Sequence, residues 1–92
     1  MLKAAGLSDI KSTLGEMRPG LCIHEMGTAR MGNDPGNSVL NKWNQVHDAK
    51  NVFVTDGACM TSISCVNPTL TFMALTSRAA NYATDQMKTG VL

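Results

Sequence analysis

The chain has 92 residues and a formal net charge of +1, with 43% hydrophobic and only 4% aromatic residues. This length allows one small domain at most. The near-zero charge, without a basic run, argues against nucleic acid as the main partner. No apolar run approaches the roughly 20 residues that cross a bilayer, so we predict no transmembrane segment.

Three cysteines and two histidines are the residues best suited to binding a metal ion. Their spacings do not match a usual zinc site and no C-x-x-C is present, so we predict no metal. A free cysteine serves by default as a small buried apolar residue. The five residues are Cys22, His24, His47, Cys59 and Cys65.

Taken in order, the chain first shows a weak helical pattern over 1–17 that is broken at Gly6. A short apolar run over 21–24 then ends in His24. Gly27 and Gly32 flank the next four residues, as expected where the backbone approaches another segment closely or takes a positive φ. Without further evidence, His24 also fits a core histidine bonded to the backbone.

Two other charged or titratable residues of the first half have ordinary structural explanations. His47 stands in a polar stretch, so we expect a solvated surface residue. Arg30 could bind an anion, but an ion pair with Glu25 or Asp34 is the simpler expectation.

The run Asn51-Val52-Phe53-Val54-Thr55 predicts a strand, because it is rich in β-branched and aromatic residues. No charge interrupts it, which favours a strand covered on both faces, as in a parallel sheet. In open α/β sheets, ligands bind at the carboxyl ends of the strands. Here that end is Asp56-Gly57.

A helix is predicted after the loop, with Asn67 as the N-cap and Pro68 at its first position. Lys88 and Gly90 are its stop signals. A buried face follows from apolar residues spaced three and four apart. These residues are Phe72, Leu75, Ala79, Ala83 and Met87. The elements together predict an α/β fold, and by themselves they also fit a helix packed on a sheet with an ordinary cap.

Four motifs in order resemble the C-terminal end of glucose–methanol–choline (GMC) oxidoreductases, a flavoenzyme family. They are residues 23–32, IHEMGTARMG, then Ser38-Val39-Leu40, then 51–57, NVFVTDG, and then 67–71, NPTLT. The resemblance covers nearly the whole chain and is weakest before Leu21. Its wording is most similar to members that act on sugars and sugar acids.

The resemblance implies that residues 1–92 are a C-terminal GMC segment, with an α+β character. It would hold the C-terminal portion of a Rossmann-like FAD-binding domain and part of the substrate-domain sheet. His24 matches the family's catalytic histidine, and Asn67 its second active-site position. Asp56-Gly57 matches the segment at the FAD phosphate and ribityl chain, and Asn67, Pro68 and Thr69 match the helix start beside the flavin.

The chemistry agrees with these roles. Oxidation of an alcohol removes a hydride from carbon and a proton from oxygen, and a neutral imidazole such as that of His24 can take the proton. The amide of Asn67 can hydrogen-bond the alcohol oxygen but cannot act as the base. A helix N-terminus at Thr69 would stabilise the negative charge of a reduced flavin.

The family's G-x-G-x-x-G motif is absent, since the eight glycines of the chain do not form it. We therefore expect a fragment, a truncated gene product or a piece of a split enzyme. Such a fragment should be inactive alone and should not retain FAD. The alternative is a remnant without catalysis of its own that binds a partner chain, such as the missing FAD-binding portion.

Overall fold

The computed structural model describes residues 1–12, 15, 20 and 23–92. Most of the predicted helical pattern beyond Ser12, and Cys22, one of the residues considered for a metal, therefore lie outside the described residues. The elements, in order, are the short 3-10 helix η1 (Lys3–Ala5), strands β1 (Gln45–Val46) and β2 (Ala49–Phe53), the 3-10 helix η2 (Gly57–Cys59) and helix α1 (Thr69–Lys88).

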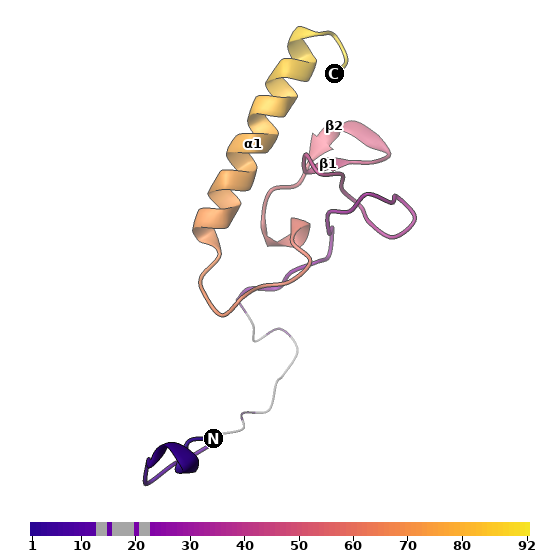
Figure 1. Ribbon diagram of the computed structural model, residues 1–92. Helices are drawn as coiled ribbons and strands as arrows, with labels where there is room; N and C mark the ends of the chain where they lie inside the picture. The colour runs from indigo at the N-terminus through magenta and orange to yellow at the C-terminus, as the bar shows by residue number, and fades with distance from the viewer. Residues whose placement is uncertain (13–14, 16–19, 21–22) are drawn as a thin grey trace.

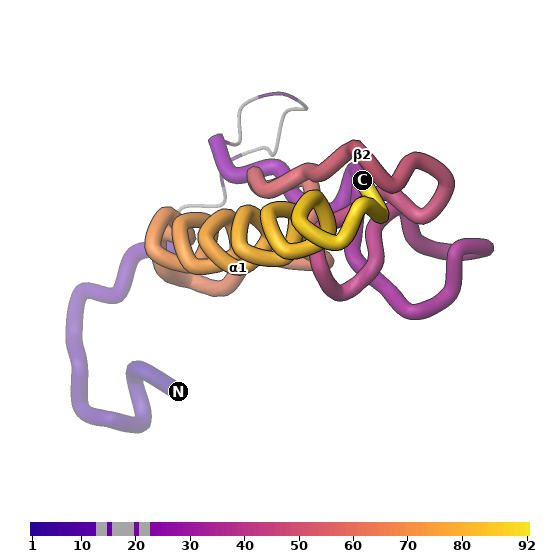
Figure 2. Tube along the Cα trace, turned by 90° about the horizontal axis from the view of Figure 1, so that it is seen from above, coloured from indigo at the N-terminus to yellow at the C-terminus, as the bar shows by residue number. Residues whose placement is uncertain are grey.

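Figure 1 shows α1 running alongside an irregular layer built from the loops and the β1–β2 hairpin. Figure 2, the view from above, shows the N-terminal end lying away from both. The fold is thus an α+β arrangement with one helix against one mostly irregular layer. In the part of the chain that the structure describes, no helix is long and apolar enough to cross a membrane.

Strands β1 and β2 form an antiparallel hairpin, with Val46 opposite Ala49 and Gln45 opposite Phe53. Two residues, His47 and Asp48, connect the strands, which is the shortest common hairpin connection. An irregularity in the register accompanies the offset between the two strands. The hairpin is therefore local in sequence.

The predicted parallel-sheet strand over 51–55 is wrong in two respects. The strand begins two residues earlier, at Ala49, and its neighbour is antiparallel. Its three central residues are exposed, so this chain does not cover both faces. The hairpin turn explains the difference, because it brings β2 back antiparallel beside β1. Among the described residues, the parallel pairing is a single isolated bridge between Met31 and Leu40. The predicted Rossmann-like sheet is thus not confirmed.

A small core lies between α1 and the loops. Its buried apolar residues are Leu40, Cys59 and Ala79. Leu40 is fully buried and joins two segments, since its carbonyl accepts from Gly32 N at 2.8 Å and its N–H donates to Arg30 O at 3.2 Å. The central packing therefore depends on few side chains.

The predicted face of α1 is confirmed over its first four turns. Phe72, Leu75 and Ala83 are half-buried and Ala79 is buried. Met87 was expected on this face but is 68% exposed. The core ends before Met87, because the loops and the hairpin do not reach the last turns of α1 (Figure 1). Packing thus uses the N-terminal part of the face.

Candidate functional site

A short extended piece, Val54-Thr55, follows β2 and leads to Asp56 and to Gly57, the first residue of η2. Asp56 caps η2, since its Oδ1 accepts from Ala58 N at 2.9 Å. The same cap gives a local reason for an aspartate at this position. Asp56 itself is exposed, so a carboxylate oxygen remains accessible to a ligand.

The His24 segment packs against this turn. A Cβ added to Gly57 would lie 3.0 Å from Glu25 O and from Met26 Sδ, so only glycine fits without a shift. The next residues continue the contact, because Ala29 N donates to Ala58 O at 3.0 Å. The structure therefore brings together the first and third family-like motifs, which are about thirty residues apart in sequence.

The glycine expectations are confirmed where the backbone approaches closely. Gly27 has φ +85° and lies beside Met60 O, at 3.5 Å from the position of an added Cβ. At Gly32 an added Cβ would lie 2.7 Å from the Cβ of Ser38. Gly27 is thus required by its positive φ, and Gly32 by the close approach of the segment that carries Ser38.

Helix α1 starts one residue later than predicted. Pro68, not Asn67, is the N-cap, because its carbonyl accepts the first helical hydrogen bond from Phe72 N at 3.0 Å. No side chain caps the helix, and its first turn has no acidic residue. Within the described residues, the first-turn N–H groups of Thr69, Leu70 and Thr71 thus lack a backbone or side-chain acceptor.

His24 is half-buried and lies in irregular backbone rather than in a strand. Asn67 is exposed and directly precedes the helix cap. The structure therefore places His24 in the loop that packs on Gly57, and Asn67 at the uncapped end of α1.

His47 is not the solvated residue that the sequence predicts. It is half-buried, and its Nε2 lies 3.1 Å from Ser38 Oγ. Ser38 Oγ already donates its proton to Asp34 O at 2.6 Å, so Nε2 of His47 must be the donor in this contact. This chain of bonds explains His47 structurally.

The predicted ion pair of Arg30 is also wrong. Across residues 1–12, 15, 20 and 23–92, the single ion pair is Lys88 with Asp85, at 3.3 Å on the surface of α1. Asp34 instead organises its own turn and accepts from Gly36 N at 2.9 Å. The Asp34 carboxylate is thus hydrogen-bonded within its own turn.

Asn44 is a central residue that the sequence analysis missed. It is fully buried with φ +63°, and its Nδ2 donates to Val54 O at 3.0 Å. Its Oδ1 accepts from Arg78 Nη2 at 3.2 Å, which links the exit of β2 to α1. The tolerance of asparagine for the left-handed region was the available signal.

Burial raises the pKa of the Cys59 thiol, and a hydrogen bond from Asn44 partly opposes this. The folded-state pKa thus lies above the ordinary value of 9.0. As pH rises above that value, the unfolded chain ionises first. The stability due to this thiol is therefore present below about pH 9 and is lost as pH rises toward the folded pKa.

We expect the free energy of unfolding to fall more steeply above about pH 9 in the natural chain than in Cys59→Ala. Urea unfolding at a series of pH values measures both slopes. Cys65→Ala is the matched control, since Cys65 is exposed, and should keep the natural slope. Equal slopes in the natural chain and Cys59→Ala would contradict the prediction.

Two kinds of polar group are accessible at the candidate site. The uncapped start of α1 offers backbone N–H groups, and Asp56, which caps η2 earlier in the chain, offers an exposed carboxylate. Among the described residues, no group of three or more His, Cys, Asp or Glu could hold a metal ion.

Similarity to known proteins identifies the class of this chain. The family profile described as GMC oxidoreductase matches residues 9–76. A 2-methyl-1,2-propanediol dehydrogenase of Mycolicibacterium austroafricanum is 46% identical over 80 residues, 87% of this chain and 14% of that protein. The fructose dehydrogenase large subunit of Gluconobacter japonicus is 40% identical over 90 residues, 91% of this chain and 16% of that protein.

The chain belongs to the GMC oxidoreductase family. It corresponds to the C-terminal segment of these enzymes, which are in general FAD-dependent. A third relative, a paromamine 6'-oxidase of Streptomyces fradiae, is 41% identical over 87% of this chain. The chain spans about one seventh of the length of these relatives.

Proposed function

We propose that this chain is the C-terminal part of an FAD-dependent oxidoreductase that oxidises a CH–OH group of an alcohol or sugar. The packing of the His24 segment on Asp56-Gly57 carries the proposal. It joins the segment with the candidate base to the turn proposed to contact the cofactor. The bound flavin would supply the hydride acceptor.

In this proposal His24 accepts the hydroxyl proton of the substrate as the hydride leaves carbon. Its loop is held by the backbone contacts of residues 25–31 with 57–61, which limits its movement. Asn67 donates an amide hydrogen bond to the same oxygen and orients the alcohol. Two residues then handle one reacting oxygen, one taking the proton and one fixing its position.

Asp56, Gly57, Asn67, Pro68 and Thr69 are the proposed cofactor contacts. The uncapped amides at the start of α1 support this role, because they favour negative charge in the absence of a side-chain cap. Pro68 is buried and leaves no N–H at the cap, so the cap position itself is fixed by packing. Proline thus positions the donors of the next residues.

A test is a hybrid enzyme. In the 2-methyl-1,2-propanediol dehydrogenase, which is 46% identical, the aligned segment is replaced by this chain. The hybrid should purify with bound flavin, and an alcohol should reduce the flavin under anaerobic conditions. A hybrid that folds and binds flavin but is never reduced by any alcohol or sugar tested would contradict the proposal.

We expect the 92-residue chain alone not to retain stoichiometric FAD. The physical reason is that it lacks the glycine-rich turn that would hold the pyrophosphate. Absorbance of the purified protein in the flavin region, before and after incubation with FAD and gel filtration, measures this. The flavin-containing hybrid is the control, and a yellow isolated chain would contradict the expectation.

A second function, binding of a partner chain without catalysis, has its own supporting observation. Leu70 and Met73 on the outer side of α1 are 79% and 64% exposed. Large apolar side chains on one helix suit a protein contact. Flavin reduction in the hybrid separates the two functions, because a pure binding remnant would not support it.

A further inference from the structure

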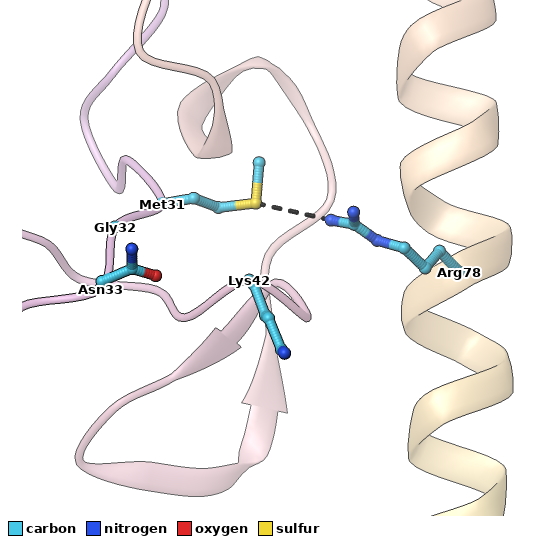
Figure 3. Close-up of a pocket in the computed structure, with 5 residues that line it drawn as sticks. All are labelled: Met31, Gly32, Asn33, Lys42 and Arg78. Carbon is cyan, nitrogen blue, oxygen red and sulfur yellow. Dashed lines mark hydrogen bonds between the residues drawn. The ribbon is translucent and has the colours of Figure 1, made fainter.

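A recess lies between α1 and the loops before the hairpin (Figure 3). Its volume is about 270 Å³, and its lining residues are Met31, Gly32, Asn33, Lys42 and Arg78. The lining contains two cationic side chains and no acidic one.

Arg78 is held in place by neutral groups. Its Nη2 donates to Asn44 Oδ1 at 3.2 Å and to Met31 Sδ at 3.8 Å. Its Cζ also lies 6.0 Å from the centre of the Trp43 ring. These contacts order the guanidinium but do not neutralise its charge.

Lys42 carries the second positive charge. Its Nζ lies 5.2 Å from the centre of the Trp43 ring, within the range of a cation–π contact. Neither Lys42 nor Arg78 pairs with a carboxylate in the described part of the chain. Nη1 and Nε of Arg78 have no acceptor there either, so donors remain available for a ligand.

We propose that this recess binds a phosphate group, either inorganic phosphate or a phosphate monoester. Two cations line the recess and match its two negative charges, and Nη1 and Nε of the arginine can each donate to its oxygens. The amide of Asn33 lines the same recess and adds donors. The site goes beyond the proposed oxidoreductase function, because none of its residues belongs to the candidate flavin site.

The arrangement depends on tertiary structure. Three segments supply the lining, namely residues 31–33, Lys42 and the middle of α1. Asn44 fixes the side chain from α1 against the loop and is itself fully buried. The Arg78 side of the recess is therefore held in place before a ligand arrives, which lowers the entropic cost of binding.

Trp43 provides the readout, because it is the only tryptophan and contacts both cations. The 92-residue chain is titrated with inorganic phosphate at about pH 8, where a phosphate group carries nearly two charges. Ionic strength is kept constant with chloride. We expect a saturable change in fluorescence. Glycerol phosphate should act similarly, and acetate should bind at least about tenfold more weakly than phosphate.

Arg78→Gln and Lys42→Gln should each weaken phosphate binding about tenfold or more. Lys88→Gln is the matched control, because Lys88 lies on the same helix but only pairs with Asp85 at the surface, and it should bind normally. Near-ultraviolet circular dichroism of the stacked Trp43 and Tyr82 rings, 4.8 Å apart, checks the fold of each variant. If Arg78→Gln loses that signal, the exposed Lys42 variant decides.

Phosphate binding that both recess variants lose and Lys88→Gln keeps would support the site. Glycerol phosphate binding separates recognition of a monoester from recognition of free phosphate only. An equal response to chloride, an equal affinity for acetate, or an equal loss in Lys88→Gln would overturn the proposal, because each indicates charge attraction without a formed phosphate site.

Discussion

His24→Ala should slow the reduction of bound flavin by substrate about 100-fold or more in the hybrid that carries this segment. Loss of a general base has this usual scale, because the hydroxyl proton then has no positioned acceptor. Flavin content should stay unchanged, since His24 lies outside the proposed cofactor contacts. Anaerobic stopped-flow absorbance with alcohol in excess measures the reduction rate.

His47→Ala is the matched control for that variant. It removes the chain's other imidazole, which is hydrogen-bonded to Ser38 and belongs to the loop structure. Its reduction rate should change little, whereas Asn67→Ala should show a smaller loss than His24→Ala through misplacement of the alcohol. Reduction of His24→Ala at the natural rate, or a slow His47→Ala, would refute the assignment.

Leu40→Ala should destabilise the 92-residue chain by about 2–5 kcal/mol, the cost of deleting a fully buried leucine side chain. Leu40 is 0% exposed and belongs to the small core that it forms with Cys59 and Ala79. Native proteins have total stabilities of about 5–15 kcal/mol, so this loss should lower the urea midpoint clearly. Urea unfolding followed by Trp43 fluorescence measures the change.

Val39→Ala is the control for Leu40→Ala. Val39 is the preceding residue but is 43% exposed, so its truncation creates no closed cavity. Its free energy of unfolding should change by about 0.5 kcal/mol or less, as for other surface substitutions. Equal losses in the two variants would show that Leu40 does not anchor the packing described above.

Several features could be predicted from the sequence because their causes are local. The apolar spacing of Phe72, Leu75 and Ala79 predicts the long helix and its packed side, since helical period and burial are read from neighbouring residues. The glycine at 27 marks a positive φ for the same reason. Four motifs in order also identified the family, which the match over residues 9–76 confirms.

Strand pairing was beyond the reach of the sequence pattern. An uncharged run such as 51–55 fits a buried parallel strand and a short exposed hairpin strand equally well at this length. The hairpin connection at His47-Asp48 selects the exposed hairpin strand, because it folds β2 back beside β1. The start of α1 moved by one residue for a similar reason, since either Asn67 or Pro68 can supply the first carbonyl acceptor.

By itself, the sequence determined the family, the helix and the residues proposed for alcohol oxidation. Only the tertiary structure decided that the His24 segment packs on Gly57, that Asn44 joins β2 to α1, and that Lys42 and Arg78 face one recess. The physical reason is that these contacts join residues far apart in the chain. Their existence depends on how the loops fold back against α1, and no local propensity encodes that path.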